Sequence, residues 1–176
     1  MGALQYVARS VNNKLLVALS TIGTHQATAT SNTNTKITQL LYYVATYPDY
    51  GILFRASGMV LTAHAYAGFL NETKARSRSG AHIFLTEDLA TPPLNGAILT
   101  IANIIKPVMA SAAEAEIAAL YITAKIMVPI RNTLEEMGWP QPKSPIQTDN
   151  STAAGFTNNT IINKAIKSLD MTFWWL

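Results

Sequence analysis

The spacing of the apolar residues changes near Gly51, and this change limits the architectures open to the chain. Before that point the apolar side chains recur at helical spacing. From Val60 to Tyr66 they alternate with polar or small residues instead, which is typical of a β-strand. We therefore expect a helical segment over residues 1–50 and a sheet-containing domain over residues 51–176.

Within the helical segment, Asn12 and Asn13 predict a break after a first helix. A loop rich in Thr, Ser and Asn is expected from Gly23 to Thr35, where there is little to bury. A further helix is expected from about Thr35 to Pro48, because proline cannot continue the hydrogen-bond ladder.

The remainder of the chain predicts strands around one long helix. That helix is expected to open at Ser111, where Ser111 and Glu114 have the spacing of a capping box, and to kink or break at Pro129. The expected strands are Val60–Tyr66, Ala81–Thr86, Ala97–Ile105, Ile146–Asp149 and Leu169–Trp175, with a short helix over Asn150–Phe156. This order predicts a mixed sheet with a helix packed across it.

Composition excludes several classes of site. The chain has no cysteine, so disulfides, zinc–thiolate sites and thiol nucleophiles are ruled out. The three histidines, His25, His64 and His82, are far apart in sequence and match no ligand spacing. Only 13% of the residues are charged, about half the usual share of roughly 25%. Such a chain is either unusually buried or adapted to a partner.

We expect no membrane span. The longest apolar stretch, Leu94–Ala113, is interrupted by Lys106 and Pro107 and falls short of the ~18 apolar residues that a spanning helix needs. Residues 1–8 lack the basic start and apolar run of a signal peptide. These features predict an intracellular protein of the cytoplasm or nucleus.

Three carboxylates stand in apolar surroundings: Glu116, Asp149 and Asp170. Isolated acids at such positions are costly unless they are paired or bind a cation, and Mg²⁺ prefers carboxylate oxygens. On spacing alone, two interpretations stay open. Either the three acids converge on a divalent cation, or they are unrelated polar positions at the ends of separate elements.

Several short motifs follow one another along nearly the whole chain. They are Gly2–Arg9 and Asp49–Phe54, the basic stretch Arg76–Gly80, Ser111–Leu120 with Glu116, Thr148-Asp149-Asn150, and Lys167–Met171 with Asp170. Their order resembles the ribonuclease H region, with its upstream connection segment, of copia-type retrotransposon polyproteins.

The resemblance implies an α/β fold: a ribonuclease H-like mixed sheet with a long packed helix, preceded by a helical connection segment. It implies two Mg²⁺ or Mn²⁺ ions and hydrolysis of the RNA strand in RNA–DNA hybrids. The residues implied as catalytic and metal-binding are Glu116, Asp149 and Asp170, and those implied to contact nucleic acid are Arg76, Arg78 and Asn150.

The chain also departs from the family pattern. No acid stands where the first strand of the family carries its aspartate, and counting back from Gly80 with a one-residue gap places that position at Tyr66. A phenol with its pKa near 10 is a poor cation ligand. Ser168 replaces the histidine before the last aspartate, and the final helix of the family is missing after Leu176. These departures predict weak cation binding and impaired hydrolysis.

Three functions therefore stay open. The chain can be a nuclease with residual activity, a silent module that binds hybrids or single strands, or a structural protein that self-associates. The third hypothesis rests on the low charge content and on the apolar tail Phe173–Trp175.

Overall fold

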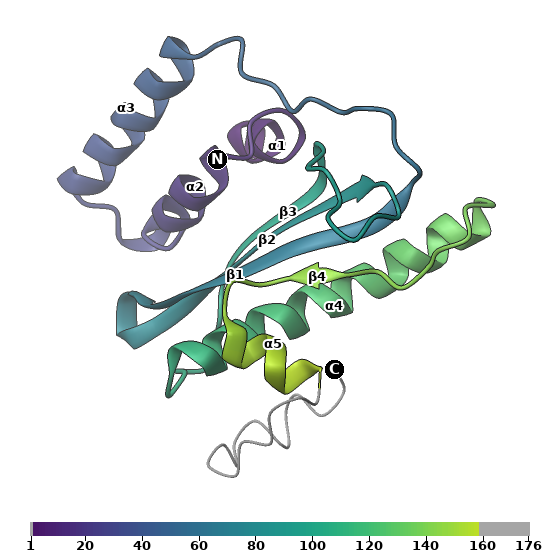
Figure 1. Ribbon diagram of the computed structural model, residues 1–176. Coiled ribbons are helices and arrows are strands. Elements are labelled where there is room, and N and C mark those ends of the chain that lie inside the picture. The colour runs from purple at the N-terminus through teal and green to yellow at the C-terminus, as the bar shows by residue number, and fades with distance from the viewer. Residues whose placement is uncertain (1, 159–176) are drawn as a thin grey trace. The chain divides into compact units, whose positions relative to one another are not determined.

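The structure is a computed structural model that describes residues 2–158 (Figure 1). It divides into two compact units, one ending at Phe54 and the next beginning at Arg55. Asp170, the strand expected over Leu169–Trp175 and the apolar tail lie outside the described residues. No helix within the described range is both long and apolar enough to cross a membrane.

The first unit is helical. Its elements are α1 (Gly2–Ser10), α2 (Leu15–Gly23), a short 3₁₀ turn (Gln26–Thr28) and α3 (Ser31–Thr46). The break expected at Asn12 and Asn13 separates α1 from α2 and is confirmed. The buried apolar side chains of the unit come mainly from α2, with Ala8 of α1 also fully buried; those of α2 are Leu15, Leu16, Leu19 and Ile22.

Helix α3 begins earlier than its composition predicts. The expected loop up to Thr35 is wrong in its second half, because Thr30 and Thr33 form a reciprocal capping box at Ser31. The amide of Thr33 donates to Oγ1 of Thr30 over 3.4 Å, and the amide of Thr30 donates to Oγ1 of Thr33 over 3.2 Å. The threonines whose abundance predicts a loop therefore form the N-terminal cap of a helix here.

The second unit is a mixed sheet with two helices. Its strands are β1 (Val60–Glu72), β2 (Arg76–Thr86), β3 (Ala97–Ile104) and β4 (Ile146–Gln147); its helices are α4 (Ala112–Glu136) and α5 (Ser151–Thr157). The strand order is β3-β2-β1-β4. The first three strands form an antiparallel meander, and β4 joins β1 in parallel. The expectation of a mixed α/β sheet with a long helix packed across it is confirmed (Figure 1).

Helix α4 begins and runs much as the sequence predicts, with one correction, at Pro129. At its start, Oγ of Ser111 accepts from the amide of Glu114 over 3.1 Å, and Oε2 of Glu114 accepts from the amide of Ala110 over 2.6 Å. No break occurs at Pro129, and the helix continues to Glu136. It ends before Gly138, whose φ of +88° favours glycine.

The core lies between α4 and one face of the sheet. Strand β1 contributes Leu61, Ala63 and Ala65 to this face, and all three are fully buried. They pack with apolar residues of α4 such as Ile117 and Leu120. Because strand side chains alternate, His64 and Tyr66 point to the opposite face. Small alanines on β1 allow a helix to approach the strand closely.

The side chain of a buried glutamine hydrogen-bonds to the edge of β1 just before the residues that pair with β4. Oε1 of Gln141 accepts from the amide of Leu61 over 2.9 Å, and its Nε2 donates to the carbonyl of Met59 over 2.9 Å. The amide of Ala63 then donates to the carbonyl of Pro145 over 3.1 Å. The segment before β4 therefore satisfies the backbone groups of β1 with a side chain where no strand is present.

Candidate functional site

Glu116 lies in the second turn of α4, where the helix crosses β1, and only 7% of it is exposed. Its Oε1 accepts a hydrogen bond from the backbone N–H of Ala67 over 2.9 Å. Its Oε2 accepts from Oγ1 of Thr148 over 3.3 Å. Two elements distant in sequence, β1 and the segment after β4, thus meet at one carboxyl group.

The electrostatic surroundings of Glu116 favour its neutral form. Burial raises the pKa of this carboxyl above its ordinary value, and the negative charge of Asp149 raises it further. The hydrogen bonds from Ala67 and Thr148 act in the opposite direction but do not cancel the effect of burial. A raised carboxyl pKa is a feature of functional sites, although structural networks produce it as well.

Asp149 and Asn150 follow β4 and lie beside this carboxyl group. Asp149 is exposed, and its charge acts on Glu116. Oγ1 of Thr148 also accepts from the amide of Asn150 over 3.3 Å. Oδ1 of Asn150 accepts from the amide of Ala153 over 2.9 Å, which caps the start of α5. The structure therefore brings Glu116, Thr148 and Asp149 together, and it gives the side-chain oxygen of Asn150 a structural role.

The third predicted carboxylate, Asp170, lies outside the described residues, so its place relative to Glu116 stays a prediction. Within residues 2–158, no group of three or more His, Cys, Asp or Glu side chains is placed to hold a metal ion. Glu116 and Asp149 are thus a pair of carboxylates in the described part of the chain.

Tyr66, where the sequence comparison places the missing aspartate, does not face Glu116. Tyr66 is 44% exposed, pairs with Gly80 on β2, and places its phenol oxygen 3.5 Å from Nδ1 of His64. It lies on the face of the sheet opposite to α4. A side chain at this position points away from Glu116, so an acid there would not share a cation with it.

Ala65, the residue before Tyr66, lies on the same side of the sheet as Glu116. It is fully buried on the α4 face of the sheet. Ala63 pairs with Ile146, and extending this parallel register by two residues puts Thr148 level with Ala65. Ala65 therefore lies level with one residue that donates to Glu116, Thr148, and two positions along β1 from the other, Ala67. The alternation of residues 60–66 in the sequence already carried this signal, because it placed Tyr66 and Ala65 on opposite faces.

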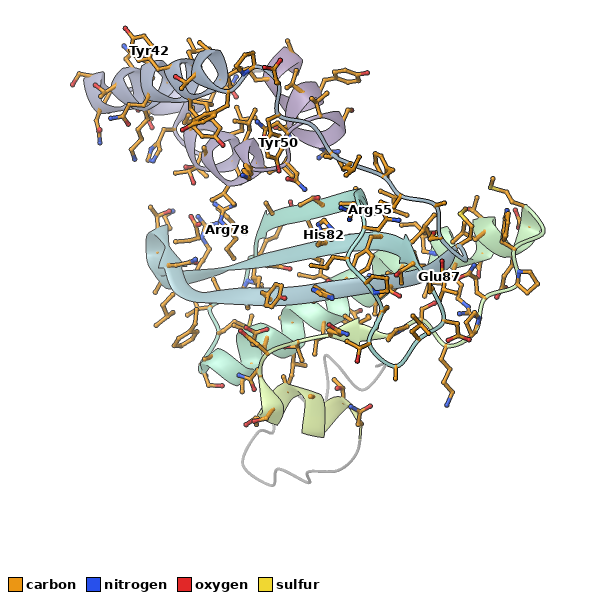
Figure 2. All side chains as sticks on the ribbon, turned by 45° about the horizontal axis from the view of Figure 1, so that its top comes forward. Tyr42, Tyr50, Arg55, Arg78, His82 and Glu87 are labelled. Atoms are coloured by element: carbon orange, nitrogen blue, oxygen red, sulfur yellow. The ribbon has the colours of Figure 1, made fainter. Side chains whose placement is uncertain are left out.

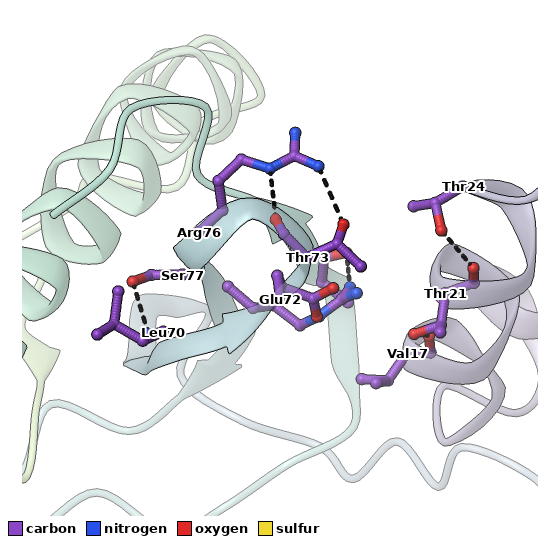
Figure 3. A network of polar contacts seen from close by, with 10 residues as sticks. Val17, Thr21, Thr24, Leu70, Glu72, Thr73, Arg76 and Ser77 are labelled. Atoms are coloured by element: carbon purple, nitrogen blue, oxygen red, sulfur yellow. Dashed lines mark hydrogen bonds and ion pairs between the residues drawn. The ribbon is translucent and has the colours of Figure 1, made fainter.

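The two predicted basic residues have different surroundings at the β1–β2 turn. Arg76 donates from Nε to the carbonyl of Thr73 over 3.1 Å and from Nη2 to its Oγ1 over 3.5 Å (Figure 3). Arg78 forms an ion pair with Glu72, with Nε 2.6 Å from Oε1, and donates from Nη1 to the carbonyl of Ala102 over 3.0 Å. The guanidinium of Arg78 thus helps to hold the hairpin, and its contact with nucleic acid stays a prediction.

Sequence reasoning did not anticipate Thr148 or Gln141. Both are uncharged, and both act through hydrogen bonds to elements far away in sequence. Thr148 stands next to the predicted Asp149, which was the available signal. Gln141 stands among prolines in a connecting segment and carries no such signal.

Comparison of the chain with models of protein families, with curated proteins and with solved structures finds no match.

Proposed function

We propose that the second unit is a ribonuclease H-like domain in which hydrolysis of RNA–DNA hybrids is impaired because β1 carries no carboxylate beside Glu116. The strand order and the parallel pairing of β1 with β4 support this proposal, as does the helix that carries Glu116 across β1. The resemblance of the sequence motifs supports it independently. The observation that carries it is the position of Ala65, a methyl group where such a site needs an acid.

The described residues do not fit two divalent cations. Glu116 and Asp149 supply two carboxylates, and both oxygens of Glu116 already accept hydrogen bonds within the protein. A carboxylate satisfied in this way stands without a cation. With Asp170 as a third ligand, we expect at most weak Mg²⁺ or Mn²⁺ binding, and we derive no hydrolytic step.

What such a domain retains is binding to nucleic acid. Two basic residues at the β1–β2 turn, the exposed Lys74 and the half-buried Arg76, can neutralise backbone phosphates without reading the sequence. We therefore propose an RNA–DNA hybrid or a single strand as the partner. Self-association through apolar surface is the alternative outcome of the tests below.

The first experiment restores an acid at two neighbouring positions. Cleavage of a labelled RNA–DNA hybrid in Mg²⁺ and Mn²⁺ is compared for the unaltered chain, Ala65→Asp, Ala65→Asn and Tyr66→Asp. We expect little cleavage by the unaltered chain and a rise of at least about tenfold for Ala65→Asp alone. Ala65→Asn is matched in volume and controls for packing, while Tyr66→Asp places the same charge on the opposite face.

Each result has a separate meaning. Efficient cleavage by the unaltered chain would remove the claim of impairment. A rise in cleavage for Tyr66→Asp alone would place the missing acid at residue 66 and not at residue 65. If Ala65→Asp is folded by circular dichroism and neither cleaves nor gains thermal stability from Mg²⁺, the ribonuclease H-like proposal fails.

The second experiment measures binding by fluorescence anisotropy across a range of salt concentrations. We expect the affinity for a hybrid to fall as salt rises and to weaken in Arg76→Ala. Lys143→Ala, an exposed lysine in the connection before β4, is the matched control. Binding that is absent, or light scattering that shows oligomers at all concentrations, would favour the self-association alternative.

A further inference from the structure

Two histidines face one another across β1 and β2, on the side of the sheet away from α4. His64 and His82 are direct partners in the antiparallel register. The ring of Phe84 lies 5.3 Å from each imidazole, between centroids, so the two rings gather around one aromatic side chain. Figure 2 shows His82 in the middle part of its strand. Directly opposed positions of an antiparallel pair have Cβ atoms about 4.5–5.5 Å apart, close enough for both side chains to reach one ion.

The hydrogen bonds of His82 fix which of its ring nitrogens is available. Its Nε2 lies 3.0 Å from the carbonyl oxygen of Asn95. A carbonyl only accepts, so Nε2 carries the proton and Nδ1 of the neutral ring has the lone pair. A ring N–H that donates to a backbone carbonyl is the arrangement that orients histidines bound to metals.

His64 presents the complementary feature. Its Nδ1 lies 3.5 Å from the phenol oxygen of Tyr66, while its Nε2 is buried and has no hydrogen-bond partner among the described residues. A buried polar atom without a partner calls for an explanation, and an ion is one of the few available. Burial lowers the pKa of His64, which favours the neutral ring that a metal ligand needs.

We propose that His64 and His82 form a two-histidine site for a late first-row divalent cation, Zn²⁺, Cu²⁺ or Ni²⁺, with water completing the coordination. Imidazole suits these ions, whereas Mg²⁺ prefers oxygen. The site lies on the face opposite to Glu116 and does not depend on the ribonuclease H-like proposal. It uses residues that match no ligand spacing in the sequence, since eighteen positions separate them and only the strand register brings them together.

The test is a titration of the full chain with Zn²⁺ by calorimetry, with Cu²⁺ paramagnetic resonance as a second readout. Variants are His64→Ala, His82→Ala and, as the matched control, His25→Ala, which removes the one histidine of the helical unit. His64→Gln and His82→Gln serve if an alanine variant unfolds. We expect one Zn²⁺ per chain, at least tenfold weaker affinity when either paired histidine is replaced, and no change for His25→Ala.

Each outcome decides the proposal. Nitrogen hyperfine structure from two imidazoles in the unaltered chain supports it, and its loss in both paired variants completes the case. No Zn²⁺ binding by the unaltered chain would overturn it. Binding that survives in folded His64→Ala or His82→Ala with unchanged affinity, or that is lost only with His25→Ala, would overturn it equally.

Discussion

The backbone N–H of Ala67 on β1 donates a hydrogen bond of 2.9 Å to Oε1 of Glu116 on α4. This contact joins a strand to the helix that crosses it, at a carboxyl group that is almost fully buried. Burial makes the ionised form costly, and the hydrogen bond compensates only in part. The protonation state of Glu116 is therefore linked to the stability of the fold.

The first prediction concerns the pH dependence of Glu116→Gln. Folding raises the pKa of Glu116, so the folded state favours the protonated carboxyl. Its contribution to stability is complete below the unfolded pKa, near 4.3, and is lost as pH rises through the folded value. Glutamine keeps an acceptor for Ala67 and can donate to Thr148, yet it never ionises. The stability of the variant relative to the unaltered chain should thus increase with pH through this window.

Urea unfolding of the two proteins at a series of pH values from about 4 to about 7 measures this difference. Using the difference removes the contribution of all other titrating groups. A difference that is constant, or that declines as pH rises, would mean that the folded protein does not raise the pKa of Glu116.

The second prediction concerns Gln141, which bonds to Leu61 and Met59 along the edge of β1. Gln141→Ala leaves the amide of Leu61 and the carbonyl of Met59 without these partners in a buried region. Leaving a buried group unsatisfied costs about 1–3 kcal/mol, which chemical denaturation can resolve. Gln147→Ala, at an exposed glutamine of β4, should change stability by less than about 0.5 kcal/mol. Equal effects of the two substitutions would show that Gln141 does not support the edge.

The third prediction compares two ion pairs. Glu72 and Arg78 are joined by a 2.6 Å contact between side chains that are 12% and 7% exposed. Arg131 and Glu135 form an exposed pair one helical turn apart. Glu72→Ala should cost about 1.5–3 kcal/mol, because a shielded hydrogen bond to a charged group is lost. Glu135→Ala should cost only about 0.3–0.5 kcal/mol. Urea unfolding checks both, and a smaller loss for Glu72→Ala would contradict the structural role of Arg78.

Much of the architecture could be predicted from the sequence because it depends on local patterns. Alternation over residues 60–66 predicts β1, and the capping spacing of Ser111 and Glu114 predicts the start of α4. Predictions failed where a residue type has two local uses. Thr30 caps a helix within a segment whose composition predicts a loop. At Pro129 the sequence predicts a kink or a break, and the helix continues without a break.

The candidate site was harder to predict from the sequence, because its geometry depends on which face of a strand meets which helix. Glu116 and Asp149 could be selected as acids in apolar surroundings, and the structure brings them near one another. Tyr66 was chosen by counting from a motif, which takes no account of the alternation of side chains along a strand, and its side chain lies on the face opposite to Glu116. The contact of Thr148 with Glu116 requires the parallel register of β4 on β1, which no local pattern specifies.

The last prediction tests whether Asp149 faces Glu116. The charge of Asp149 raises the pKa of Glu116, so Asp149→Asn should lower that pKa while burial still keeps it above the ordinary value. Carbon-detected magnetic resonance of the Glu116 carboxyl follows the titration directly in both proteins. Glu136→Gln, at an exposed acid near the end of α4, is the matched control and should leave the titration unchanged. Adding Mg²⁺ provides a second comparison, because a bound cation lowers the pKa of its ligands. If the pKa of Glu116 is the same in Asp149→Asn as in the unaltered chain, the two carboxylates do not interact. They could then not serve as two ligands of one cation.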